Sequence, residues 1–246
     1  MKRFEGKTIL ITGGNSGIGL AGATRLVNEG AKVVITGKNK ERLSEAATIL
    51  GTNAIVIEDD LSDGNSPERI VPMIQDLGGL DGLWLNAGIA SGAAVEQLDK
   101  KAISDMFEVN VVAPMLQLSA VSPFLKEGSS VLVTSSTAVY EGLATVSLYS
   151  ATKGALLSAA RCWASELAPR KIRVNTLVPG PIKSNLRAGL PPEMKKELED
   201  RLAETLLLKR IGEPEEAAAL ALFLLSDDAR FITGSSYLVD GGYLLM

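Results

Sequence analysis

The feature that most constrains the fold is the alternation of short apolar runs with longer helix-forming stretches. Seven runs rich in Val, Ile and Leu are predicted as strands: 8–11, 32–36, 54–57, 82–85, 130–134, 173–177 and 237–239. Helices are predicted between them: 17–29, 40–50, 66–77, 99–125, 148–168, 193–207 and 214–225. Apolar strands separated by helices form a parallel sheet with helices on both faces and right-handed crossovers. We therefore expect an α/β, doubly wound sheet of seven mainly parallel strands.

No linker, composition shift or repeat divides the 246 residues, so we expect one domain over 1–246. The segment "VPGPIKSNLRAGLPPEMKKELEDRL", after the sixth strand, contains four prolines and becomes charged. Ligands of open α/β sheets bind at the carboxyl ends of the strands. A substrate lid near 183–210 is the functional interpretation, and a surface insertion is the alternative.

The composition restricts the partners and the compartment. Net charge is -4 with both signs scattered, so no nucleic-acid footprint is expected. The longest apolar run, 217–225, is too short to span a membrane, and no signal-peptide core precedes the first strand. The single cysteine, Cys162, cannot form an internal disulfide, which favours a cytoplasmic protein. We expect Cys162 to be packed within its helix, and no Cys/His cluster is present to hold a metal.

A glycine-rich loop, "TGGNSGIG", follows the first strand and places Gly13, Gly17 and Gly19 before a helix. Glycine allows close backbone approach, and the free N–H groups of a helix start favour a pyrophosphate. The spacing is G-x-x-x-G-x-G rather than the general G-x-G-x-x-G. A tight turn without a ligand is the alternative.

The second strand ends "VVITGKNKERL", where NAD-binding sites place a carboxylate for the adenosine ribose. Here Gly37 stands at that position and Lys38 follows. A basic side chain accommodates a 2′-phosphate, so we predict NADP(H) in preference to NAD(H), with NAD(H) use still open. In the alternative, Lys38 only begins a solvated helix.

The stretch "LYSATKGALLSAA" places Tyr149 and Lys153 four residues apart, on one face of a predicted helix. Taken alone, the pair is typical of a solvated helix surface. The surrounding motifs favour another interpretation.

Seven motifs in order resemble one family: "TGGNSGIG", "LNAG" (85–88), "FEVNVVAP", "VTSS" (133–136), "YSATK" (149–153), "VPGPIKS" (178–184) and "ITGSSYLVDGG" (232–242). The chain resembles a compact, single-domain short-chain dehydrogenase/reductase with a Rossmann-like fold, over essentially its whole length. One departure is Leu85, where the family often has a first asparagine before Asn86, and this puts one polar contact in doubt.

The resemblance implies a catalytic set. Tyr149 resembles the acid/base, Lys153 its partner, Ser136 the serine that orients the substrate, and Asn110 the residue that holds a water in the proton relay. Taken alone, Asn110 would be a helix-interior group that satisfies backbone, and Ser136 would belong to a turn.

The resemblance also implies a cofactor-binding set. Asp60 resembles the residue that contacts the adenine, and Ile182 and Ser184 those that meet the nicotinamide carboxamide. The full set is Gly13, Asn15, Ser16, Gly17, Ile18, Gly19, Lys38, Asp60, Leu61, Asn86, Ala87, Gly88, Tyr149, Lys153, Pro179, Gly180, Ile182 and Ser184.

The chemistry explains the Tyr149–Lys153 spacing. The reference pKa of tyrosine is about 10, too high for an acid/base near neutrality. An ammonium about 5 Å away favours the phenolate by ~3 kcal/mol, or roughly two pKa units, at an effective dielectric of ~20. Ser136 would stabilise charge on the same carbonyl oxygen. The number of residues between the tyrosine and the lysine is larger in enoyl reductases that resemble this fold, which favours carbonyl/alcohol chemistry here. Extended sugar-nucleotide epimerases of similar fold have longer chains than this one.

The expected substrate is a small hydrophobic ketone or secondary alcohol. The predicted walls are apolar: Ala90, Ala138, Val139, Leu143, Val146, Pro181, Leu186 and Leu190. The predicted contacts are Ser136, Ala138, Leu143, Tyr149, Pro181 and Leu186, and Arg187 and Lys183 could reach in from the lid. In the alternative, these apolar residues only pack the lid.

We also expect a homo-oligomer, as a tetramer like its relatives, because the chain ends in the apolar "VDGGYLLM". The alternative function is an NAD(P)-binding sensor without turnover, which would have no need of the Tyr149 acid/base.

Overall fold

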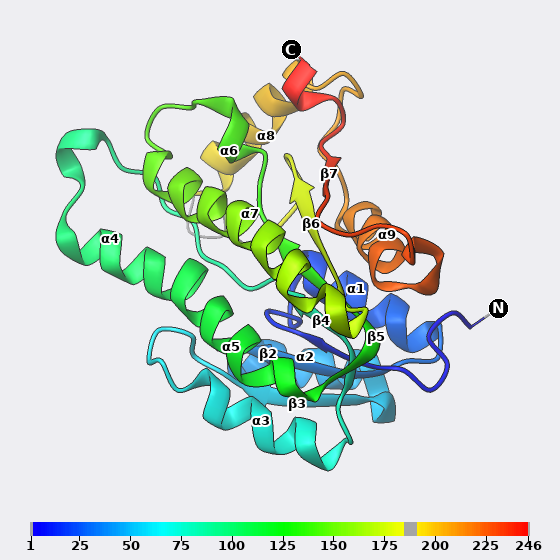
Figure 1. Cartoon of the computed structure of the whole chain (residues 1–246). Coiled ribbons are helices and arrows are strands. Elements are labelled where there is room, and N and C mark those ends of the chain that lie inside the picture. Colours follow the sequence, from blue (N-terminus) through cyan, green and yellow to red (C-terminus); the bar gives the residue numbers. More distant parts are fainter. Residues whose placement is uncertain (1, 185–190, 246) are drawn as a thin grey trace.

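The computed structural model describes residues 2–184 and 191–245 and contains one seven-stranded parallel sheet (Figure 1). Its order is β3-β2-β1-β4-β5-β6-β7, which confirms the predicted α/β doubly wound architecture. The strands are β1 (Thr8–Ile11), β2 (Lys32–Gly37), β3 (Ala54–Glu58), β4 (Leu80–Leu85), β5 (Leu125–Thr134), β6 (Arg173–Pro179) and β7 (Ser236–Val239).

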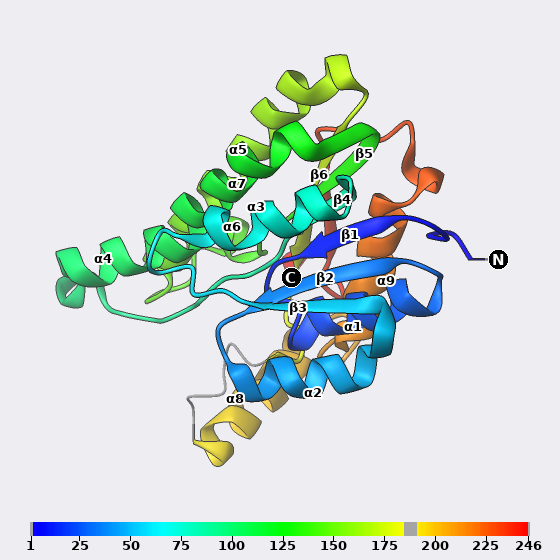
Figure 2. The same cartoon turned by 90° about the horizontal axis from the view of Figure 1, so that it is seen from below.

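Helices cover both faces of the sheet (Figure 2). They are α1 (Gly17–Asn28), α2 (Lys40–Leu50), α3 (Ser66–Asp76), α4 (Lys100–Phe107), α5 (Ala113–Val121), α6 (Ala138–Glu141), α7 (Ser147–Leu167), α8 (Pro192–Thr205) and α9 (Pro214–Leu225). One buried cluster joins the sheet to α1, α2 and α9, and the other joins it to α3, α5 and α7. The helix α9, apolar almost all round, buries six residues, as expected for such a helix.

The helix predicted over 99–125 is interrupted. A π-helical turn, Glu108–Val112, separates α4 from α5, and Leu125 already belongs to β5. Pro114 has no N–H to donate to the carbonyl of Asn110, four residues earlier, which removes one hydrogen bond of a regular α-helix at this point. The break places Asn110 in a local conformation that is often found at functional sites.

The expectation that Cys162 is packed was wrong, because its side chain is exposed on α7. The buried face of α7 includes Leu148, Leu156, Ala160 and Ala164, a spacing that leaves Cys162 on another face. Within the described ranges, no helix has both the length and the apolar character needed to cross a bilayer.

Candidate active site

The candidate site lies at the carboxyl ends of β1 and β4, where the strand order reverses. The loops after these strands touch: a Cβ on Gly13 would lie 3.0 Å from the Cα of Ala87. Thr12 joins the same loops, because its Oγ1 accepts from the backbone N–H groups of Asn86 (3.0 Å) and Ala87 (3.1 Å). Residues about 75 positions apart therefore lie side by side at this edge of the sheet.

The glycine-rich loop has the shape of an anion cradle. Gly13 has a φ of 66°, and a Cβ on Gly19 would lie 2.4 Å from the Gly13 carbonyl oxygen. Within the described chain, the Ser16 side chain at the start of α1 makes no capping hydrogen bond to the backbone N–H groups of the helix. The first turn of α1 also contains no acidic residue. The free N–H groups therefore fit the pyrophosphate of a dinucleotide.

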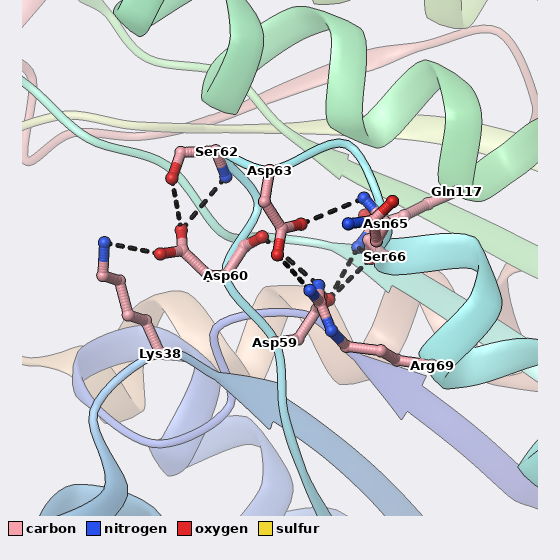
Figure 3. A network of polar contacts seen from close by, with 9 residues as sticks. All are labelled: Lys38, Asp59, Asp60, Ser62, Asp63, Asn65, Ser66, Arg69 and Gln117. Carbon is pink, nitrogen blue, oxygen red and sulfur yellow. Dashed lines mark hydrogen bonds and ion pairs between the residues drawn. The ribbon is translucent and has the colours of Figure 1, made fainter.

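The Asn15 side chain fills the space beside position 37 at the end of β2. A Cβ on the buried Gly37 would lie 2.5 Å from Cγ and Nδ2 of Asn15, in the glycine-rich loop. An acid at this position would displace Asn15. The next residue, Lys38, is exposed and pairs with Asp60 at 2.6 Å between Nζ and Oδ2 (Figure 3).

Asp60 follows β3 and stays ionised. Burial opposes its charge, but hydrogen bonds from Lys38 and Ser62 outweigh burial and lower the pKa of Asp60 to about 2. The neighbouring Leu61 is buried. The structure thus brings Lys38 and Asp60, predicted as separate contacts, into one ion pair.

A buried polar network holds the loop that carries Asp60 (Figure 3). The buried Asp59 carboxylate accepts from Arg69 at 2.9 Å, from the Ser66 hydroxyl at 2.6 Å and from Gln117 at 3.3 Å. Sequence reasoning missed this network. The acidic run "EDDLSD" followed by Arg69 was a signal for part of it, but nothing local pointed to Gln117 on α5.

Helix α7 presents Tyr149 and Lys153 together. The Lys153 Nζ lies 5.9 Å from the centre of the Tyr149 ring and donates to the Thr134 carbonyl at 3.1 Å. Lys153 is only 3% exposed, so the alternative of a solvated surface pair is wrong. Burial lowers the pKa of Lys153 to about 8.

The serines after β5 lie against this lysine. Ser135 Oγ donates to the Lys153 carbonyl at 3.0 Å, which ties β5 to α7. Ser136 is half-buried, and its Oγ accepts from the Ala138 N–H at 3.2 Å. Ser135 thus commits its hydroxyl proton to a backbone carbonyl, whereas the Ser136 Oγ serves as an acceptor in its bond to Ala138.

The Asn110 side chain links the loop after β4 to α7. Its Oδ1 accepts from the Ile89 N–H at 2.8 Å, and its Nδ2 donates to the Ile89 carbonyl at 2.9 Å and to Thr152 Oγ1 at 3.1 Å. Thr152 in turn donates to the Tyr149 carbonyl at 2.8 Å. Asn110 does satisfy backbone, as the simpler interpretation expected, but in a distant loop rather than in its own helix.

Gly88 lies where these parts converge. A Cβ on Gly88 would lie 3.1 Å from both Asn110 Oδ1 and Lys153 Nζ. The structure therefore brings the Asn86–Gly88 loop, Asn110 and Lys153 together.

Trp84, on β4, was not identified from the sequence. Its indole donates to Thr134 Oγ1 at 2.9 Å, which donates to Asn86 Oδ1 at 3.2 Å. A Cβ on Gly22 of α1 would lie 2.3 Å from the Trp84 ring, so this glycine makes room for the indole. Next to it, Leu85 is buried in the apolar core.

The segment after β6 supplies the remaining predicted contacts. Pro179, Pro181 and Ile182 are buried, and a Cβ on Gly180 would lie 2.6 Å from Cβ of Asp240. Half-buried Ser184 lies near the glycine-rich loop, 3.9 Å from a Cβ built on Gly17.

The residues predicted to contact or reach the substrate differ in how far they are exposed to solvent. Ala138 is buried, and Leu143 is 48% exposed. Lys183 forms an ion pair with Glu213 rather than standing unpaired. Leu186, Arg187 and Leu190 lie outside the described residues.

Comparisons with known proteins cover nearly the whole chain. A family model described as enoyl-(acyl carrier protein) reductase matches residues 13–244. The chain is 36% identical over 243 residues to dehydrogenase/reductase SDR family member 4 from Homo sapiens, covering 96% of this chain and 87% of that protein. It is 35% identical over 246 residues to tropinone reductase-like 3 from Erythroxylum coca, covering 98% and 94%.

A solved structure agrees with the fold. The crystal structure of a short-chain dehydrogenase/reductase, glucose/ribitol dehydrogenase, from Brucella melitensis has a TM-score of 0.92 and 33% identity to this chain. The match covers 98% of each chain.

Proposed function

The chain belongs to the short-chain dehydrogenase/reductase family, and on that premise we propose that it interconverts a ketone and a secondary alcohol, with NADP(H) preferred over NAD(H). The observation that carries the proposal is the buried Lys153 ammonium beside Tyr149, next to the Asn86–Gly88 loop that contacts the glycine-rich loop. When bound, the nicotinamide cofactor supplies or accepts the hydride.

Tyr149 is the proposed acid/base. In the reductive direction its hydroxyl gives a proton to the carbonyl oxygen, and in the oxidative direction its phenolate takes the proton from the alcohol. The Lys153 ammonium favours the phenolate, and the low dielectric around this buried lysine strengthens the effect. Ser136 donates to the same oxygen and stabilises charge that develops there. Asn110 holds the loop after β4 against α7 and is proposed to position a water for the proton relay.

The proposed cofactor contacts are those predicted from the motifs, from Gly13 to Ser184. The glycine at position 37 supports NADP(H), because it supplies no carboxylate to bind the ribose or repel a 2′-phosphate, and the Asn15 side chain occupies the space beside it. Lys38 is the proposed phosphate contact.

A small hydrophobic substrate is supported by the apolar surroundings. Ala138, whose N–H donates to Ser136, and Pro181 are buried, and Leu143 in the segment after β5 is about half exposed. Tropinone reductase-like 3 bears the name of a ketone reductase, which agrees with carbonyl chemistry. The segment near 183–210, with α8, is the proposed lid.

A homotetramer in the cytoplasm is also proposed. Helix α5 and the turn before it expose Val112, Met115 and Leu116, each at least 36% accessible and spaced along one helical face. Phe231 is fully exposed elsewhere on the chain. Such apolar residues favour contact between copies. Size-exclusion chromatography with light scattering should give four times the 25.9 kDa chain mass, and a monomer mass would contradict the assembly.

The test of function is oxidation of NADPH and NADH with aryl and aliphatic ketones, followed at the nicotinamide absorbance. Tyr149→Phe should lower kcat by about 10²- to 10⁴-fold, because it removes the hydroxyl that transfers the proton while keeping the ring. Tyr237→Phe, in a tyrosine packed against the core, is the matched control and should retain activity.

Other outcomes separate the alternatives. Saturable NADPH binding without turnover on any ketone or alcohol would favour the sensor. Turnover of an enoyl thioester but of no ketone would favour the chemistry in the family model's description.

A further inference from the structure

We propose that Asp60 weakens the discrimination in favour of cofactors that carry an adenosine 2′-phosphate, because its carboxylate holds Lys38 and stays beside the place that the phosphate must enter. The inference rests on the proposed function, in which Lys38 meets that phosphate. It makes Asp60 a specificity-determining residue that acts against Lys38.

Asp60 is held rigidly. Its Oδ1 accepts from the Ser62 N–H at 3.1 Å and from the Ser62 hydroxyl at 2.7 Å. Its backbone carbonyl accepts from Arg69 at 3.4 Å, and Arg69 also binds Asp59 and Asp63 on either side (Figure 3). Asp59 is buried and paired with Arg69, and Asp63 pairs with the same arginine, so the chain is fixed both before and after Asp60.

Lys38 is the partner that can move. Its side chain is 72% exposed, against 35% for Asp60, and it reaches the carboxylate from the end of β2. Ion pairs this exposed are weak, so an incoming phosphate can draw the ammonium away. The carboxylate cannot follow, because Ser62 and Arg69 keep their hold on Asp60.

The Asp60 charge therefore acts differently on cofactors with a 2′-phosphate and on cofactors with a 2′-hydroxyl. Asp60 is ionised at neutral pH, and a 2′-phosphate would share Lys38 with this negative charge and be repelled by it. A 2′-hydroxyl is neutral and meets no such repulsion. Neutralising Asp60 should thus favour the phosphate-bearing ligand selectively.

The experiment measures binding by calorimetry with two probes, 2′,5′-ADP and 5′-AMP, which lack the nicotinamide and cannot turn over. The readout is the ratio of the 5′-AMP Kd to the 2′,5′-ADP Kd. We expect Asp60→Asn to raise this ratio about five- to tenfold, the range of one weakly screened charge interaction. The common adenine contact cancels in the ratio, and so does any change in the folded fraction.

Glu58→Gln is the matched control. Glu58 ends β3, is 55% exposed and pairs with Lys40 at 3.2 Å, so it loses the same charge without releasing Lys38. Its ratio should stay within twofold of the wild type. An unchanged ratio in Asp60→Asn, or an equal rise in Glu58→Gln, would overturn the inference.

Lys38→Met separates this inference from the proposed function. It should lower the ratio, since the proposed phosphate contact is lost. If Lys38→Met lowers the ratio and Asp60→Asn leaves it unchanged, the NADP(H) proposal stands and the role of Asp60 falls. If Lys38→Met leaves the ratio unchanged, the proposed role of Lys38 fails, and this inference fails with its premise.

Discussion

Replacing Lys153 with methionine should stabilise the protein at neutral pH while abolishing its activity. Burial lowers the pKa of Lys153 from 10.5 to about 8, so the folded protein holds its proton less tightly than the unfolded chain. The difference corresponds to about 3 kcal/mol of lost stability, which is present in full below pH 8. Between pH 8 and 10.5 the unfolded state binds more protons, so the stability of the wild type rises with pH.

Methionine carries no charge and escapes this loss, but it also loses the hydrogen bond to the Thr134 carbonyl, worth about 1 kcal/mol. We expect Lys153→Met to be more stable than the wild type by about 2 kcal/mol at pH 7, with the advantage vanishing as pH rises through 10. Groups that titrate identically in both proteins cancel in the difference.

The assay is equilibrium unfolding in urea of the cofactor-free protein, at one protein concentration, followed by the fluorescence of the two tryptophans. Lys32→Met, at an exposed position on β2, is the control and should change stability by less than about 0.5 kcal/mol. A Lys153→Met protein that is no more stable than the wild type at pH 7, or a difference that does not shrink toward pH 10, would refute the reasoning.

Two further substitutions probe the packing behind the site. Gly22→Ala should destabilise the protein by about 1–3 kcal/mol in thermal or urea unfolding, because the new methyl would meet the Trp84 ring at 2.3 Å. Gly154→Ala is the control, because it has open space around it in α7, and it should be neutral or stabilising by up to about 1 kcal/mol. Equal effects at the two glycines would contradict this account of Trp84. Arg69→Met should cost about 3 kcal/mol in the same assay, since it leaves the Asp59 carboxylate buried without its ion pair, and a loss under 0.5 kcal/mol would show that Ser66 and Gln117 suffice.

The local pattern of apolar residues was sufficient to predict most of the helices and strands. The apolar runs predicted all seven strands, because strands covered on both faces must be apolar throughout. The exceptions lie between 99 and 125, where Pro114 breaks the helical pattern beside Asn110 and β5 begins at Leu125. Cys162 shows the same limit, since residue type alone predicted burial and the orientation of α7 exposed it.

The sequence by itself determined the sheet, the glycine-rich loop and the i, i+4 spacing of Tyr149 and Lys153, because each depends on residues close together in the chain. Tertiary structure alone decided that Lys153 is buried, that Asn15 fills the space beside Gly37, and that Asp60 holds Lys38. These contacts join segments that only the folded sheet brings together, and the desolvation and charge interactions that tune the site depend on those distances rather than on sequence spacing.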